Sequence, residues 1–139
     1  MNIVDKIRAR FQKDGIMFDE DTNEDGVTFF RLRQKTESEY LIILISFNDD
    51  YSACDITIGN IVRIESPLKR EELLKLLNEF NGKYRYQKYF VEDNGDVLVQ
   101  YSLPVTDSTE GEDVERVLII ILGGIIKDNL PKFMKLRWS

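Results

Sequence analysis

Residues 66–104 read SPLKREELLKLLNEFNGKYRYQKYFVEDNGDVLVQYSLP, and this stretch decides the fold of the chain. Its first part has the period of an amphipathic helix, with apolar side chains at Leu73, Leu76, Leu77 and Phe80. Ser66 stands where a helix N-cap would, and Pro67 suits the first helical position. We therefore expect a helix that begins at Pro67 and ends at the stop signal Asn81-Gly82.

The second part of the same stretch alternates apolar and polar side chains, which is typical of β-strands. Two such runs, Tyr84–Glu92 and Asp96–Leu103, are joined through Asp93-Asn94-Gly95. Asn-Gly favours the tight turn whose twist suits a hairpin. The sequence therefore predicts an antiparallel hairpin directly after the helix, with Pro104 closing its second strand.

Further elements flank this region. Before it, residues 3–11 have one apolar helical face, and strands are expected at 27–33, 40–47 and 55–65, with Ile16–Phe18 as a short additional strand. Tyr40–Phe47 is almost wholly apolar, so we expect it to be central in its sheet. After it, an apolar helix begins near Val114 and should end at Pro131. The tail that follows should dock its apolar side chains on the domain through Phe133, Leu136 and Trp138.

The element order α-β-β-β-α-β-β-α predicts an α+β fold in one domain spanning residues 1–139. Short links between consecutive strands imply antiparallel pairing. We expect a single antiparallel sheet of about five strands, packed by three helices that gather on one face and bury it.

Composition excludes several classes of function. The chain has 139 residues, 19 basic and 25 acidic side chains, a net charge of -6, no histidine and one cysteine. Phosphate affinity comes mainly from clustered Lys and Arg, so we expect no nucleic-acid partner. Ser-His-Asp catalysis and multi-cysteine zinc sites are ruled out. We therefore expect no enzyme activity, no catalytic residue, no metal and no cofactor.

The compartment follows from the same reading. The N-terminus carries charges every few residues and so lacks the apolar core of a signal peptide. The longest apolar run, Val117–Ile126, is shorter than the about 20 residues that a membrane-spanning helix needs. With a single unpaired cysteine, these features predict a cytoplasmic protein with no membrane partner.

Two short motifs have a functional and a structural interpretation. Asp21–Gly26 matches the first six positions of an EF-hand loop, but Leu32 stands where the bidentate glutamate should be, which favours a solvated acidic loop. Cys54 has no histidine to act as a base and has Asp55 beside it, which favours a buried structural thiol.

The segment Lys83–Phe90 interleaves basic and aromatic side chains, as in stacking platforms for single-stranded nucleic acid. The alternative is an amphipathic strand that packs its rings while the Lys and Arg stems lie at the rim. The acidic balance of the chain favours this alternative.

The last helix is apolar nearly all round, because Ile119, Ile120 and Ile126 widen its apolar stripe. One sheet covers only one side of such a helix. Either other helices cover the remainder or these three residues contact a second chain, and Gly123-Gly124 would permit a close approach. We favour self-association.

Residues 71–81, 84–90 and 95–104 resemble the YbjN family, which is described as bacterial sensory transduction regulators. The element order is similar to the type III secretion chaperone fold, to which that family is related. The resemblance implies a bacterial homodimer that contacts other proteins without catalysis. It also implies a dimer contact through the middle helix and the following strand, here Leu73–Phe80 and Tyr84–Phe90, in disagreement with the last helix.

The leading hypothesis is a dimeric protein-interaction domain, chaperone-like or a regulatory adaptor, that binds a protein client through a sheet edge or an apolar groove. Its acidic surface should favour basic clients. The candidate contact residues are Leu73, Leu77, Phe80, Tyr84, Tyr86, Ile119, Ile120 and Ile126. The alternatives are a single-stranded nucleic-acid or small-ligand binder using Tyr84–Phe90, and a metal-dependent enzyme built on carboxylates.

Overall fold

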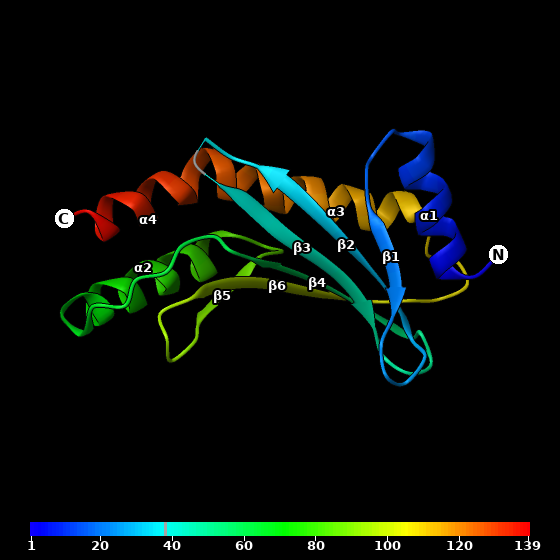
Figure 1. Cartoon of the computed structure of the whole chain (residues 1–139), viewed down its shortest axis with the longest axis horizontal. Helices are drawn as coiled ribbons and strands as arrows, with labels where there is room; N and C mark the ends of the chain where they lie inside the picture. Colours follow the sequence, from blue (N-terminus) through cyan, green and yellow to red (C-terminus); the bar gives the residue numbers. More distant parts are fainter. Residues whose placement is uncertain (38) are drawn as a thin grey trace.

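The computed structural model describes residues 1–37 and 39–139 and shows one antiparallel sheet with helices packed against it (Figure 1). The sheet has six strands in the order β1-β2-β3-β4-β6-β5. The strands are β1 (Asp19–Thr22), β2 (Thr28–Lys35), β3 (Tyr40–Phe47), β4 (Ala53–Gly59), β5 (Lys88–Val91) and β6 (Val97–Pro104). The helical segments are α1 (Ile3–Lys13), η1 (Pro67–Lys69), α2 (Arg70–Lys83), α3 (Gly111–Gly124), the π-helical η2 (Ile125–Asn129) and α4 (Leu130–Arg137).

One face of the sheet forms the core. The register aligns its inward side chains across the strands: Phe30 lies opposite Ile45, which lies opposite Ile56. Ile58, two residues further on the same face of β4, lies opposite Val99, and Val99 lies opposite Tyr89. These side chains are all buried. An inward set that runs unbroken from β2 to β5 therefore provides one continuous apolar surface for helices to cover.

All the α-helices cover that same face. The ring centroid of Phe11 in α1 lies 6.2 Å from that of Phe30 in β2. The ring centroids of Phe80 in α2 and Phe133 in α4 lie 5.4 and 5.6 Å from that of Tyr89 in β5. α3 bridges the two ends and continues through η2 into α4. In Figure 1 this helical rod passes behind β2 and β3. The fold class and the placement of the helices were therefore predicted correctly.

Some element boundaries differ from the sequence prediction. The sheet has six strands rather than about five, and the short additional strand, β1, lies at Asp19–Thr22 instead of residues 16–18. β4 ends at Gly59 because Asn60 adopts a positive φ of 59°, which turns the chain out of the ladder. The middle helix starts with the 3₁₀ turn η1, and the Ser66 side chain makes no capping bond there. β5 begins only at Lys88.

The C-terminal helix is longer than predicted. Pro131 does not end it, because the proline falls in the first turn of α4, where its missing N–H costs little, directly after the wide turn of η2. Continuing the helix carries Phe133 into the core, where it stacks edge-on against Phe80 at 5.3 Å. Trp138, which was expected to dock, is 75% exposed.

The glycines of α3 show which of its sides are crowded. A Cβ at Gly111 would overlap the backbone carbonyl of Lys6, so this glycine lets α1 and α3 approach closely. A Cβ at Gly124 would overlap the side chain of the buried Gln87. Gly123 faces open space. Of the pair Gly123-Gly124, only Gly124 is therefore needed for a close contact within the chain.

We predict opposite effects of two alanine substitutions in α3. Gly111→Ala should lower the free energy of unfolding by about 1–3 kcal/mol, because α1 must move away. Gly123→Ala should raise it by up to about 1 kcal/mol, because alanine is the better helix former and meets no neighbour. Urea unfolding of both variants tests this, and equal effects would contradict the packing described.

Candidate protein-interaction surface

The face of the sheet opposite the helices is uncovered throughout the part of the chain that the structure describes. We call it the open face. It consists of the outward side chains of the six strands: Asp19, Asp21, Phe29, Arg31, Arg33, Lys35, Tyr40, Ile42, Leu44, Ser46, Ala53, Asp55, Thr57, Gly59, Lys88, Phe90, Leu98, Gln100, Ser102 and Pro104. Outward residues alternate with the core residues along each strand, so the pleat of the backbone presents them together on one side.

An apolar row crosses the open face. Ile42 lies opposite Gly59 in the β3–β4 register, and Leu98 lies opposite Phe90 in the β5–β6 register. Gly59 and Leu98 are neighbours, because a Cβ at Gly59 would lie 3.0 Å from the Leu98 side chain. Ile42 is 36% exposed and Phe90 is 41% exposed. Three strands, β3, β6 and β5, therefore carry apolar side chains on a surface that faces solvent, and β4 contributes a glycine between them.

This exposure adds to the interpretation of Tyr40–Phe47. The strand is third of six, so its predicted interior position in the sheet was correct. Only one of its sides is buried: Leu41, Ile43, Ile45 and Phe47 point into the core, whereas Tyr40 and Ile42 are exposed. The continuous apolar run thus belongs to an interior strand that has one side in the core and the other on the open face.

The two edges of the sheet are poor templates for an added strand. At the β5 edge, the Asn81 side chain accepts a hydrogen bond from the Tyr89 backbone N–H at 2.6 Å and donates one to its carbonyl at 3.0 Å. The backbone groups that an incoming strand would need at Tyr89 are therefore occupied. At the β1 edge, all four residues are exposed and three of them carry carboxylates. Asn81 had been interpreted only as a helix stop.

The predicted contact residues of the middle helix lie inside the molecule. Leu73, Leu77 and Phe80 are buried in the core. Tyr84 is half-buried, and its hydroxyl donates to the Asn129 Oδ1 at 2.8 Å, while burial raises its pKa. Tyr86 is half-buried and packs edge-on against Tyr101 at 5.4 Å. A partner could reach the three core residues only if α2 moved.

The segment Lys83–Phe90 does not present its rings as a stacking platform. Tyr84 and Tyr89 pack against Phe80 of α2 and Tyr86 packs against Tyr101 of β6, whereas the ring of Phe90 is exposed on the open face. The Lys88 ammonium donates to the backbone carbonyls of Asn81 and Tyr84 at 2.7 and 2.8 Å. The segment is therefore an amphipathic strand, and its Lys88 binds backbone carbonyls at the C-terminal end of α2.

The predicted contact residues of the last helix, unlike those of the middle helix, lie at or near the surface. Ile119 is 58% exposed and Ile120 is 44% exposed on the outer side of α3, and Ile126 in η2 is half-buried. The sequence left open whether other helices cover these side chains. No described helix covers Ile119 and Ile120, so they form a second apolar surface, on the side of the molecule opposite the open face.

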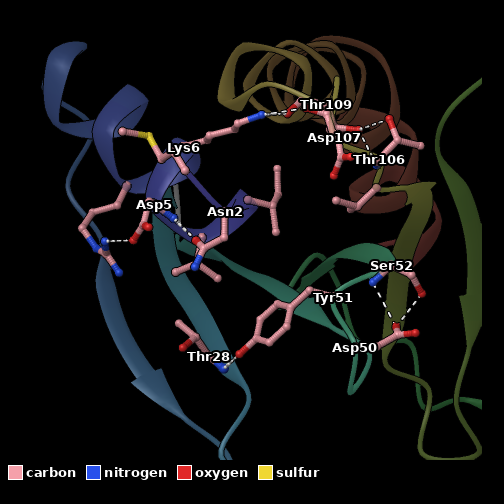
Figure 2. A pocket seen from close by; sticks show the side chains of 15 residues that line it. Asn2, Asp5, Lys6, Thr28, Asp50, Tyr51, Ser52, Thr106, Asp107 and Thr109 are labelled. Atoms are coloured by element: carbon pink, nitrogen blue, oxygen red, sulfur yellow. Dashed lines mark hydrogen bonds and ion pairs between the residues drawn. The ribbon is translucent and has the colours of Figure 1, made fainter.

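A cavity of about 860 Å³ lies between α1, the β3–β4 loop and the β6–α3 connection. Figure 2 shows its polar groups turned toward nearby loop and strand atoms. The Lys6 Nζ donates to the carbonyls of Asp107 and Thr109 at 3.1 and 2.9 Å, and the Tyr51 hydroxyl accepts from the Thr28 N–H at 2.9 Å. The Asp50 carboxylate accepts from Ser52, which lowers its pKa. These groups hold the loops in place.

The remaining candidate motifs have structural explanations. The Asn23 side chain accepts hydrogen bonds from the backbone of Asp25 and Val27, so the EF-hand-like segment forms the β1–β2 turn. Cys54 is fully buried, which raises the pKa of its thiol to about 12. Among residues 1–37 and 39–139, no three His, Cys, Asp or Glu side chains form a group that could hold a metal ion. No helix in those ranges is long and apolar enough to span a membrane.

Comparison with known families gives a match over residues 4–122 to the YbjN model, described as "Putative bacterial sensory transduction regulator". The chain belongs to the YbjN family. No curated protein matches it. Among solved structures, it is similar to the Yersinia pestis type III secretion chaperone SycH, determined in complex with a stable fragment of YscM2. The TM-score is 0.57 at 10% identity, covering 90% of this chain and 98% of SycH, so the likeness concerns the fold.

We predict that Asn81 protects the β5 edge of this YbjN protein. Asn81→Ala should lower the free energy of unfolding by about 1–3 kcal/mol, because the Tyr89 backbone loses two partners. Asn78→Ala, at an exposed position of the same helix, is the control and should change it little. Urea unfolding measures both, and an unchanged Asn81 variant would show that the two hydrogen bonds do not hold β5 to α2.

Proposed function

We propose that this YbjN protein is a non-enzymatic protein-interaction domain, chaperone-like or a regulatory adaptor, that holds a client segment on its open face. The observation that carries the proposal is the apolar row of Ile42, Leu98 and Phe90 on a surface that no described element covers. Family membership and the chaperone-like fold support a role in binding proteins. We propose that the protein acts in the cytoplasm.

The mode of binding is burial of client side chains on the open face. Strand addition was the other mechanism expected from the sequence, and it is disfavoured by the Asn81 bonds at β5 and the carboxylates of β1. Apolar side chains of a client would displace water from Ile42, Leu98 and Phe90, which gives a favourable free energy roughly proportional to the area buried.

We further propose that the protein forms a homodimer through α3. Two large aliphatic side chains, Ile119 and Ile120, are exposed side by side on its outer surface, whereas the contact residues implied for α2 are buried. A contact at α3 leaves the open face accessible, because the two surfaces lie on opposite sides of the sheet. Each protomer of the dimer could then hold one client segment.

Substitution of Ile119 tests the dimer. We expect Ile119→Glu to be monomeric at concentrations where the unmodified protein is a dimer, because a carboxylate would be buried without a partner. Leu68→Glu is the matched control, since Leu68 is 93% exposed in η1, away from α3, and this variant should stay dimeric. Sedimentation velocity measures the mass of each. A monomeric unmodified protein, or a dimeric Ile119 variant, would contradict the assignment.

Site-specific photo-crosslinking tests the client surface. We expect a photoreactive phenylalanine analogue at position 42 or 90 to form adducts with another protein in source cells, because both positions lie in the apolar row. The same analogue at position 68, the more exposed control, should form few. Mass spectrometry identifies the adducts. Equal yields at the three positions, or none at 42 and 90, would refute binding on the open face.

A further inference from the structure

A stripe of cations lies beside the apolar row of the open face. Arg31, Arg33 and Lys35 occupy alternate positions of β2, and all three are exposed. The residues between them, Leu32 and Gln34, fall on the other side of the strand. Because side chains alternate along a strand, the three positive charges project from the same side as Ile42 and Leu44. We call them the cationic stripe.

This stripe contrasts with the charge of the whole molecule. The chain carries 25 acidic and 19 basic side chains, for a net charge of -6. Many of its cations are in ion pairs, such as Arg8 with Glu20 at 2.7 Å and Arg63 with Asp96 at 2.8 Å. Within residues 1–37 and 39–139, no member of the cationic stripe is in an ion pair, although Asp19 lies opposite Arg31.

Each cation has an apolar neighbour across the β2–β3 pair. Arg31 lies opposite Leu44, Arg33 opposite Ile42, and Lys35 opposite Tyr40. The Arg33 guanidinium stacks over the Tyr40 ring at 5.4 Å, and that of Arg31 over Phe29 at 5.7 Å. A stacked guanidinium keeps its edge N–H groups available for a carboxylate and loses little conformational freedom when it binds one. The cationic stripe therefore runs beside the apolar side chains of β3, and the apolar row leads away from it across the sheet, from Ile42 to Phe90.

We propose that the client segment held on the open face is acidic, with large apolar side chains next to its Asp or Glu residues. This inference rests on the proposed function and names the chemistry of the partner. The carboxylates would meet Arg31, Arg33 and Lys35, while the apolar side chains would cover Ile42, Leu98 and Phe90. It reverses the expectation of basic clients, because the acidic groups that set the net charge lie mostly elsewhere on the molecule.

Selection from a displayed library of random peptides tests this chemistry without a known client. We expect peptides recovered on the unmodified protein to be enriched in Asp and Glu interspersed with Leu, Ile and Phe. A synthetic copy of a recovered peptide should bind about tenfold more weakly to Arg33→Glu, and more weakly at high salt, because a charge contact is reversed and screened. The neutral variant Arg33→Gln should have an intermediate effect.

Controls separate this inference from the proposed function. Lys135→Glu removes an exposed cation of α4, far from the open face, and should leave binding unchanged. Circular dichroism of each variant verifies that it folds. If peptides are recovered and lost with Ile42→Glu but are neutral or basic, only the acidic chemistry is overturned. If no recovered peptide depends on Ile42, the proposed function itself fails.

Two other occupants are outcomes of the same test. A labelled single-stranded oligonucleotide that binds the unmodified protein but not Arg33→Glu would mean that the cationic stripe contacts phosphates, which overturns the proposal. A change of oligomeric state in Ile42→Glu, measured by sedimentation velocity, would mean that a second copy covers the open face, which overturns it as well. We expect neither result.

Discussion

The packing of one long apolar helix against a single side of the sheet is the constraint on which the rest of the structure depends. α3, η2 and α4 form an almost continuous rod that buries Leu118, Ile121, Ile125 and Phe133. α1 and α2 pack at the two ends of the same side, each through a phenylalanine that contacts an inward ring of the sheet. Every described helix is thus used on that side, so the other side of the sheet must face water.

An uncovered sheet face in a monomer is usually polar, because antiparallel sheets alternate apolar and polar side chains. Here the alternation fails at β3, β5 and β6, where Ile42, Phe90 and Leu98 point outward. The same sheet protects both of its edges, by Asn81 at β5 and by carboxylates at β1. Aggregation by pairing of edge strands is therefore disfavoured. Association through the open face is still possible, but it requires a partner whose side chains are complementary to that surface.

Much of the fold follows from local patterns in the sequence, whereas the surfaces depend on tertiary contacts. The helix and hairpin of residues 66–104 were predicted because period and turn residues agree there. Pro131 was misinterpreted as the end of the helix, because a proline is tolerated in a first helical turn. The interior position of Tyr40–Phe47 was predicted correctly, but an apolar run does not reveal that one side of the strand is exposed. The role of Asn81 requires β5 to lie beside α2, and no local pattern reveals that. The alternation of Arg31 and Arg33 with Phe30 and Leu32 in the sequence does indicate that one side of β2 faces solvent.

Local charge, rather than net charge, decides which partner such a surface accepts. At physiological ionic strength, electrostatic interactions are screened over about 8 Å, so the carboxylates of remote elements act weakly on a segment that touches β2. The nearest positive charges are those of Arg31, Arg33 and Lys35, and two of them are held in place by rings. The nearest carboxylates on the same face are Asp19 and Asp21 of β1, beside the Arg31 end of the stripe. The net charge of -6 still acts at longer range by slowing the approach of acidic partners and of nucleic acid. Binding of an acidic client then requires the apolar contacts as well. The three cations alone would attract a peptide carboxylate and a nucleic-acid phosphate alike, so the apolar contacts select the peptide.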